Sequence, residues 1–401
     1  MERRNFLMAA TAALAGTALS RTVLADDLPG DVRITRIVGF DLVSQRSKIA
    51  GKNARLDVHG DRATDRMVRL YTNAGVEGFG NCRAEKDAAA QLIGKDPFEF
   101  FRREDFKFVS PLGVGTMPLW DLLGKVLKKP AFKMMGGAGT EKVPVYDGSI
   151  YFADLLPQYA ERWRERFQEE IDMGLAIGHR AFKIKIGRGS KWMPREEGDA
   201  RDVEVVQMIR QHAGKGVFLG VDANNGYDLM GTMRFLGRTA AVKLAFVEEM
   251  FPETINDCLA LKEFLKGQRS TTLLADGETQ QELEAFKPFM AKQAIDIYQG
   301  DMNHFGIDGI LTEAAWAAEQ RLHIAPHNWG SLGGYYQQLH VGRAISNFYR
   351  AEHDPLSTRV LIAEGYDRKD GLASVPESPG FGLALDEKAF AMDAKIRFDV
   401  S

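Results

Sequence analysis

The chain has 401 residues, of which 45% are hydrophobic and 27% charged, and its formal net charge is -3. This composition is typical of a globular protein with a sizeable core and argues against wholesale disorder. Because no block of like charge stands out, nucleic acid is not expected as a partner. The two cysteines, Cys82 and Cys258, lie far apart, which argues against a disulfide framework and a zinc cluster.

The first 25 residues have the layout of an export signal. Arg3 and Arg4 precede an uncharged apolar stretch that leads to Val23-Leu24-Ala25, a small-residue cleavage pattern. This arrangement resembles a twin-arginine signal, and the apolar stretch is short for a membrane span. We therefore expect residues 1–25 to be removed and the mature protein to be periplasmic, without a membrane association.

Residues 26–142 are interpreted as a small α+β domain. The segments "ITRIVGFDLVSQR" and "MVRLYTNAGVEGFGNC" predict strands, the second broken by a hairpin turn at residues 73–75. A helical stretch over "LWDLLGKVLKKPAFKMM" is expected to end at Gly136-Gly137. The loop between the first strands is either a solvated loop or a lid, and its basic side chains are Lys48, Lys52, Arg55, His59 and Arg62.

Residues 143–362 alternate short apolar runs with amphipathic helical stretches. The runs that predict strands are "VPVYDGSIYF", "AFKIKIG", "VFLGVDANN", "LAFVEEM", "TLLADGE", "AIDIYQGDMN", "LHIAPHN" and "NFYRAEHD". Repeated βα units of this number predict a parallel (β/α)8 barrel of the TIM type, so the fold class is α/β with an added α+β domain. Residues 363–401 are expected to return to the first domain.

Polar side chains stand at or near the C-terminal ends of successive runs, 23 to 37 residues apart, and they are Lys185, Asp222, Glu248, Glu278, Asp301, His327 and Glu352. In a barrel these strand ends form one ring around one mouth. A helix cap would explain any single acid at such a position, but it does not explain the whole set in register. The pattern therefore predicts one site at this mouth.

Three of these residues, Asp222, Glu248 and Glu278, would converge as a carboxylate cluster. Carboxylates this close raise each other's pKa unless a cation neutralises them, and oxygen donors suit a hard divalent ion such as Mg²⁺. The cluster therefore predicts a bound metal ion. Glu249 and Asp276 remain near alternatives as ligands.

Lys183 and Lys185 lie two residues apart on a predicted strand, so their side chains point the same way. The residues that alternate with the lysines, Phe182, Ile184 and Ile186, are apolar and would face the surrounding helices. This alternation favours lysines that point into the barrel over lysines that face solvent. Burial and like charge would lower the pKa of both lysines, and a lysine with a pKa of roughly 7 to 8 can act as a base. One could then remove a proton while the other binds a substrate carboxylate.

His327 follows Asp301 by one βα unit. A carboxylate on Nδ1 would orient the imidazole and support its charged form, leaving Nε2 to exchange a proton with substrate. Glu352 is interpreted as a supporting acid beside the substrate carboxylate, and Asn224 as a further substrate contact.

The chain resembles the enolase superfamily and, within it, the mandelate racemase branch. The motifs that carry the resemblance occur in order and are "LYTNAGVEGFGNC", "LWDLLGKVL", "FKIKIG", "GVDANNGY", "FVEEMFPE", "ADGE", "QGDMNHFG" and "APHNWGS". The first two look like signatures of a capping domain, and the others follow the barrel motifs. The resemblance implies Lys183 and Lys185 as the KxK pair, Asp301 and His327 as the catalytic dyad, and Mg²⁺ ligands at Asp222, Glu248 and Glu278.

The resemblance further implies a Mg²⁺-dependent enzyme that removes the proton α to a carboxylate through an enediolate, with Lys185 or His327 as base. Loss of a β-hydroxyl would make it a lyase, and we expect a sugar-acid dehydratase. Return of the proton or ring closure would instead make it a racemase, epimerase or cycloisomerase. Two other classes stay open, a Schiff-base aldolase acting through Lys185 and a periplasmic acid-binding protein without turnover. A homo-oligomer is expected because many relatives form one.

Overall fold

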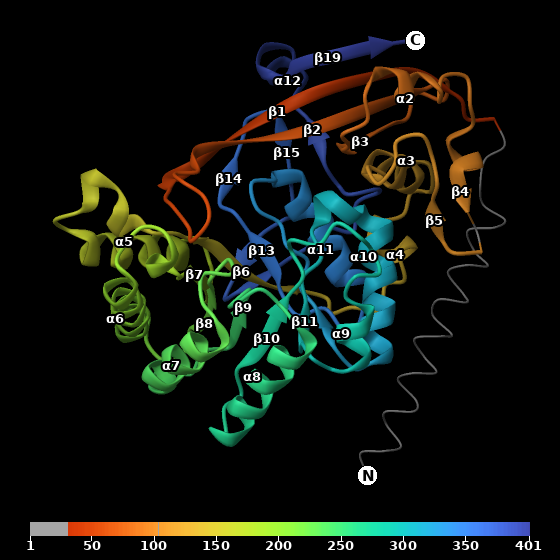
Figure 1. Ribbon diagram of the computed structural model, residues 1–401. Helices are drawn as coiled ribbons and strands as arrows, with labels where there is room; N and C mark the ends of the chain where they lie inside the picture. The colour runs from red at the N-terminus through yellow and green to blue at the C-terminus, as the bar shows by residue number, and fades with distance from the viewer. Residues whose placement is uncertain (1–30, 103) are drawn as a thin grey trace.

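The computed structural model describes residues 31–102 and 104–401. The predicted export signal, residues 1–25, lies outside the described residues. Figure 1 shows two parts, an antiparallel sheet with its helices above and a ring of strands surrounded by helices below. Among the residues described, no helix combines the length and the apolar character that crossing a membrane requires.

The upper part is built on two long strands, β1 (Ile34–Ala50) and β2 (Gly60–Thr72), and a shorter one, β3 (Glu77–Asn81), paired antiparallel in that order. Apolar side chains such as Phe40 and Leu42 alternate along β1 and are buried, as expected for a sheet with one covered face. The hairpin turn predicted at residues 73–75 is confirmed, with Gly75 N donating to Thr72 O over 3.2 Å.

The helices of this part cover the sheet, and its smaller elements are α2 (Lys86–Ala90), a 3-10 turn (Pro97–Phe100), β4 (Phe101–Arg102), β5 (Lys107–Phe108), α3 (Met117–Leu127) and α4 (Ala131–Met134). The single helix expected up to Gly136 is wrong, because the structure breaks it in two. Lys128 takes a left-handed conformation with φ 53°, and Pro130 cannot donate a backbone hydrogen bond.

The lower part contains the predicted parallel strands, which are β6 (Val143–Ile150), β7 (Ala181–Lys185), β8 (Phe218–Asp222), β9 (Phe246–Glu248), β10 (Leu273–Asp276), β11 (Ile297–Tyr298), β12 (His323–Ile324) and β13 (Ala351–His353). Neighbours in this series pair in parallel from β6 to β12, and β13 pairs with β6. Backbone bonds from Ile324 N to Asn347 O and from Tyr349 N to Ile324 O join β12 to the segment before β13. The sheet therefore closes into a barrel, as predicted.

The helices between these strands form the outer ring, and they are α5 (Trp163–Ala176), α6 (Arg195–Ala213), α7 (Leu229–Thr239), α8 (Ile255–Gly267), α9 (Lys287–Ala291), α10 (Met302–Glu319) and α11 (Leu332–Ala344). Short 3-10 turns cover residues 153–155, 157–159, 188–190 and 240–242. Each connection leads from the C-terminal end of one strand back to the start of the next. The loops that follow the strands therefore gather at one end of the barrel.

The segment after β13 runs back over both parts of the molecule. Its elements are β14 (Leu356–Ser357), β15 (Leu361–Ile362), β16 (Arg368–Lys369), β17 (Leu372–Ala373), β18 (Ala384–Leu385), α12 (Glu387–Asp393) and β19 (Lys395–Val400). β17 pairs with the first barrel strand, while β14 and β19 both pair with β1. The C-terminal residues thus contribute to the upper sheet and also touch the barrel.

Buried polar contacts hold the upper part on the mouth of the barrel. Arg46 donates to both carboxylate oxygens of Asp354 over 2.7 to 3.0 Å. Lys48 Nζ lies 2.6 Å from an oxygen of Glu170 on α5. Since all four side chains are buried, breaking either pair would leave a charge without compensation, and we describe the upper part as a capping domain.

Candidate active site

The register of the barrel brings three predicted site residues into one row. Lys185 on β7 is paired with Asp222 on β8, and Asp222 is paired with Glu248 on β9. Each of these residues is the last of its strand, so the three side chains reach the mouth at the same level. The sequence spacing alone predicted such a ring, and the strand pairing produces it.

Glu278 joins this row from the turn that follows β10. Gly277 has φ 130°, a conformation that favours glycine, and it turns the chain so that Glu278 faces the other acids. Ligand oxygens of Asp222, Glu248 and Glu278 all lie within 4.8 Å of one another. Three hard oxygen donors at this separation fit a divalent cation such as Mg²⁺. Glu249 and Asp276, the alternative ligands, fall outside this group of three.

Lys183 is completely buried beneath the carboxylates. Its Nζ lies 2.6 Å from Glu248, 2.8 Å from Glu352 and 3.3 Å from Asp222. An ammonium group has three hydrogens, and each has a carboxylate to receive it. The predicted role of Lys183 as a substrate contact is therefore not what its geometry favours, because its hydrogen bonds are already made within the protein.

Lys185 forms an ion pair with Asp222 and lies 5.3 Å from the centre of the Tyr151 ring. Burial alone would lower the pKa of Lys183 and Lys185, but the nearby acids outweigh it and raise the pKa of both. The lowered lysine pKa values expected beside a bound metal ion stay a prediction, because the raised values reflect the surrounding carboxylates without a cation among them.

The carboxylates respond unequally to the same surroundings. Burial raises the pKa of Glu248 well above its usual range, and Lys183 offsets only part of this effect. For Asp222 burial also acts to raise the pKa, but Lys185 and Lys183 together lower it below its usual range. A cation held by the three acids would favour the ionised form of Glu248 and weaken the hold of Asp222 on Lys185.

The predicted dyad forms at the other side of the cluster. His327 Nδ1 lies 2.5 Å from Asp301 Oδ2, and its Nε2 lies 3.3 Å from Glu278. Burial would lower the pKa of His327, but Glu278, Glu352 and Asp301 outweigh it and raise the pKa to about 10. The charged imidazolium is thus favoured, and its Nε2 is directed at the cluster.

Asp301 serves two purposes with its two oxygens. Oδ1 accepts hydrogen bonds from the backbone N–H groups of Asn303 and His304 and so caps α10, while Oδ2 holds His327. A helix cap and an orienting carboxylate were rival interpretations of an acid at a strand end. Here one side chain does both, and the cap fixes the carboxylate against which the imidazole rests.

Glu352 and Asn224, two further predicted site residues, lie beside the acidic cluster. Although burial opposes it, Lys183 lowers the pKa of Glu352, which also accepts a hydrogen bond from Asn328 N over 2.9 Å. A carboxylate held in its ionised form is a poor proton donor, so its geometry does not favour a supporting acid. The Asn224 amide donates to Glu278 over 3.1 Å, while its buried Oδ1 has no hydrogen-bond partner among the described residues.

The sequence analysis missed two aromatic residues close to the cluster, Tyr151 and Trp329. They pack together with His59 of the predicted basic loop, and Tyr151 is stacked on Trp329 at a ring separation of 4.6 Å. Tyr151 follows β6 directly, and Trp329 lies two residues after His327. Both follow a barrel strand, so their position at a strand end is the sequence signal that could have found them. That signal was considered only for charged residues and histidine.

The basic loop between β1 and β2 is smaller than predicted. Lys48 lies on β1 and is tied to Glu170, and Arg62 lies on β2. Lys52 and Arg55 remain in the connection, where the Lys52 ammonium lies 3.9 Å from the centre of the Trp192 ring. Lys48 is therefore not available to bind an acidic substrate.

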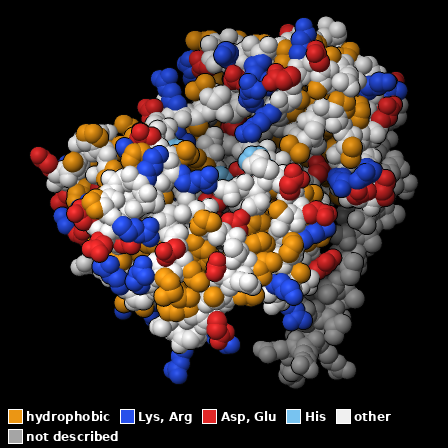
Figure 2. Space-filling model, viewed as in Figure 1, with side chains coloured by type: hydrophobic (Ala, Val, Ile, Leu, Met, Phe, Trp, Pro, Cys, Tyr) orange, Lys and Arg blue, Asp and Glu red, His pale blue; other side chains and the backbone are white. Residues whose placement is uncertain are grey.

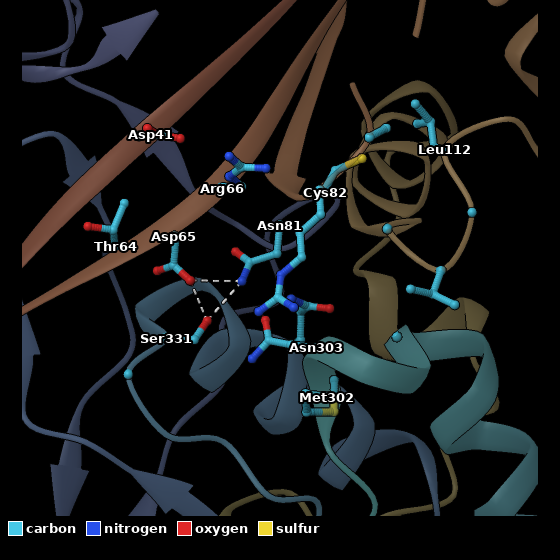
Figure 3. Close-up of a pocket in the computed structure, with 18 of the residues that line it drawn as sticks. Asp41, Thr64, Asp65, Arg66, Asn81, Cys82, Leu112, Met302, Asn303 and Ser331 are labelled. Carbon is cyan, nitrogen blue, oxygen red and sulfur yellow. Dashed lines mark hydrogen bonds between the residues drawn. The ribbon is translucent and has the colours of Figure 1, made fainter. Parts of the chain in front are cut away.

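A cavity of 710 Å³ lies between the capping domain and the rim of the barrel. Figure 2 shows the molecule hollowed between its upper and lower parts, with histidine atoms visible in the hollow. Figure 3 shows Asn81 from the capping domain hydrogen-bonded to Asp65 and Ser331, with Asn303 and Met302 below them. Met302 and Asn303 directly follow Asp301, so this cavity adjoins the dyad.

Comparison with known proteins identifies the class. A profile of the family described as "Enolase C-terminal domain-like" matches residues 162–389, which is more than half of the chain. The protein therefore belongs to the enolase superfamily, in the mandelate racemase branch that its motifs resemble.

Individual relatives cover most of the chain. Arabinonate dehydratase of Saccharolobus solfataricus is 28% identical over 296 residues, covering 72% of this chain and 73% of its own. A galacturonate dehydratase structure from Geobacillus sp. is 29% identical with a TM-score of 0.86, covering 93% of this chain and 100% of its own. A mandelate racemase/muconate lactonizing protein from Geobacillus sp. Y412MC10, complexed with magnesium and tartrate, is 29% identical with a TM-score of 0.85, covering 92% and 96%.

Proposed function

We propose that this protein is a Mg²⁺-dependent sugar-acid dehydratase. The observation that carries the proposal is the carboxylate cluster of Asp222, Glu248 and Glu278, flanked by Lys185 at one member and His327 at another. Proton carriers on two sides of an acidic cluster suit removal of a proton α to a carboxylate. Relatives named as dehydratases of arabinonate and galacturonate support the substrate class.

The three carboxylates would hold the Mg²⁺. Their oxygens are close enough to share one ion, and the magnesium complex of a relative supports the choice of metal. A bound Mg²⁺ would supply positive charge that stabilises the substrate carboxylate as negative charge moves onto its oxygens.

The side chains of the chain itself would carry the protons. Lys185 or His327, in its neutral form, removes the α proton, and the other group stands on a different side of the cluster. A cation held by the three acids would favour that neutral form, because it would offset the negative charge of Asp222 beside Lys185 and of Glu278 beside His327. In a dehydration the bond between the β carbon and its hydroxyl then breaks, and the hydroxyl leaves as water after receiving a proton from a protonated side chain. His327, whose charged form is favoured, is suited to supply that proton.

Lys183 and Asp301 would not touch the substrate but would position the groups that do. Lys183 offsets the charge of Asp222, Glu248 and Glu352, which would otherwise repel one another in a buried space. Asp301 holds the His327 ring so that Nε2 remains directed at the cluster. Both are positioning residues in this proposal.

An isomerase is the second candidate, because the same two proton carriers could return the proton to the substrate. One experiment separates the possibilities. The protein, with Mg²⁺ in D₂O, is incubated with arabinonate, galactonate, gluconate, xylonate and galacturonate and followed by NMR and mass spectrometry. Loss of water supports the dehydratase, with a 2-keto-3-deoxy product from the aldonates and a 5-keto-4-deoxy product from galacturonate. Deuterium at the α carbon without loss of water supports an isomerase.

Results outside these two would overturn the proposal. Saturable binding of an acid without exchange would indicate a binding protein. Covalent trapping of substrate on Lys185 by borohydride in the presence of chelator would indicate an aldolase that needs no metal. Full activity in chelator would exclude the metal-dependent route.

We infer that the protein is exported through the twin-arginine route. The support is the sequence of residues 1–25, with Arg3 and Arg4 before an apolar stretch. In cells, the mature protein is expected in the periplasmic fraction with an N-terminus near Asp26, and replacing both arginines by lysine is expected to retain it in the cytoplasm. A processed wild-type protein in the cytoplasm would contradict this inference.

We also propose a homo-oligomer, and its support is the exposure of two apolar side chains on the C-terminal segment, Ile396 and Met392. Light scattering of the purified protein would show a multiple of the monomer mass, and a monomer at high concentration would refute it.

A further inference from the structure

A buried nitrogen atom of His59 has no hydrogen-bond partner among the described residues. The atom is Nε2 of the imidazole, which lies at the end of the connection between β1 and β2. Burying a polar atom without a partner is costly and uncommon in native proteins, so such an atom calls for a reason. No step proposed above uses His59.

His59 contacts an aromatic side chain that also lies beside the proposed base. Its ring packs edge-on against Tyr151 at 4.8 Å and against Trp329 at 5.8 Å between ring centres. Tyr151 also carries the Lys185 ammonium over its ring, at 5.3 Å. His59 and Lys185 therefore share one aromatic neighbour at the mouth of the barrel.

The surroundings fix which nitrogen of His59 carries a hydrogen. The indole N–H of Trp329 donates to Nδ1 over 3.4 Å, so Nδ1 acts as an acceptor and the hydrogen of the neutral ring lies on Nε2. Burial, together with the nearby cations Lys185 and Arg46, lowers the pKa of His59 to about 4. The free nitrogen is thus a neutral N–H donor.

The connection that carries His59 is held against the barrel. Phe152 N donates to Lys52 O over 3.0 Å, and the indole N–H of Trp192 donates to Asn53 O over 2.6 Å. His59 N donates to Ala50 O over 3.1 Å, which closes the connection on itself. The donor is therefore fixed before any ligand arrives, which reduces the entropy lost on binding.

We propose that His59 Nε2–H donates a hydrogen bond to a hydroxyl oxygen of the substrate's polyhydroxy chain and thereby selects sugar acids that carry that hydroxyl. The inference rests on the proposed function and names a residue that determines specificity within it. A neutral donor suits a hydroxyl oxygen, while the substrate carboxylate would bind the cation that the acidic cluster holds. A site with a buried donor discriminates strongly against an analogue that lacks the matching oxygen.

A pair of similar substitutions tests the proposal. Gln can place an amide N–H near the position of Nε2, whereas Asn is too short and reaches only the position of Nδ1. We expect His59→Gln to stay within about threefold of wild type, and His59→Asn to lose roughly 10- to 100-fold in kcat/KM, mainly through KM. His323→Phe, which changes an exposed histidine of β12, is the matched control and should not alter either constant.

Deoxy substrates complete the test. Starting from the sugar acid that wild type turns over best, a set of analogues is made, each lacking one hydroxyl. Wild type and His59→Asn should have equal kcat/KM on the analogue that lacks the hydroxyl bound by His59. Equal losses for Gln and Asn, no loss for Asn, or a loss of the same size on every analogue would overturn the role of His59. If wild type turns over none of the sugar acids, the proposed function itself fails, which is a separate result.

Discussion

The imidazole of His327 and the carboxylate of Asp301 form a pair across two consecutive strands, with Nδ1 and Oδ2 2.5 Å apart. The strand ends themselves are bridged, because Asp301 and His327 are partners in an isolated parallel bridge. The same register that closes the barrel therefore sets the geometry of the dyad. Replacing either side chain should disturb proton transfer without disturbing the backbone that positions it.

Asp301→Asn should lower kcat by at least about 100-fold while changing KM little, because the ring of His327 loses the negative charge that supports its protonated form. The Asn side chain can still accept the backbone hydrogen bonds that cap α10, so the melting temperature should change little. The measurement is steady-state turnover beside thermal unfolding. Unchanged kcat would show that the dyad has no part in the reaction.

Lys183→Met should destabilise the protein by about 3 to 5 kcal/mol in chelator, since the ammonium that offsets three buried carboxylates is removed without a comparable change in volume. Added Mg²⁺ should restore part of this loss, because a cation among the acids compensates the same charge. Urea unfolding with EDTA measures the loss of stability, and urea unfolding with Mg²⁺ measures how much of it is restored. Equal stability of variant and wild type in EDTA would contradict the charge balance described for Lys183.

Mg²⁺ should raise the unfolding free energy of wild type by about 2.7 kcal/mol when its concentration is 100 times the dissociation constant. Glu278→Gln should abolish most of this increase, because one of the three oxygen donors loses its charge. The control is Glu282→Gln, an exposed glutamate four residues further on, which should respond to Mg²⁺ as wild type does. An equal response of both variants would argue that the ion binds elsewhere.

Stability should fall below pH 6.5 partly through the histidine pair His179 and His353, whose Nε2 and Nδ1 lie 2.9 Å apart in the interior. Burial lowers the pKa of His179 to about 4, whereas the same residue has a pKa near 6.5 in the unfolded chain. Between these two values the unfolded chain binds a proton that the folded protein does not. Acid therefore favours unfolding over this range.

The size of this effect is on the order of 2 kcal/mol at pH 5 relative to pH 7. His179→Asn should be less stable than wild type at pH 7, but its unfolding free energy should decline less between pH 7 and pH 5. Urea titrations at the two pH values give the comparison. Parallel declines in variant and wild type would show that His179 does not contribute to the acid sensitivity.

The sequence by itself determined the barrel and the composition of its mouth. Eight repeated βα units predict a parallel barrel, and parallel strands joined by crossover helices all place their C-terminal ends at the same rim. Polar residues placed after each strand, from Lys185 to Glu352, must therefore meet there. That argument needs only the spacing of apolar and polar residues, which a single sequence contains.

Only the tertiary structure decided what each polar group does at the rim. The pKa of Lys183 depends on how many carboxylates surround it, and three come from strands that are distant in sequence. The sequence pattern places Lys48 in a basic loop, whereas the fold places it on β1, against Glu170 of α5. The proposed role of His59 likewise depends on its packing against Tyr151 and Trp329, which the sequence does not show. Charge interactions depend on distances in space, so the order of residues along the chain does not reveal which charges are close together.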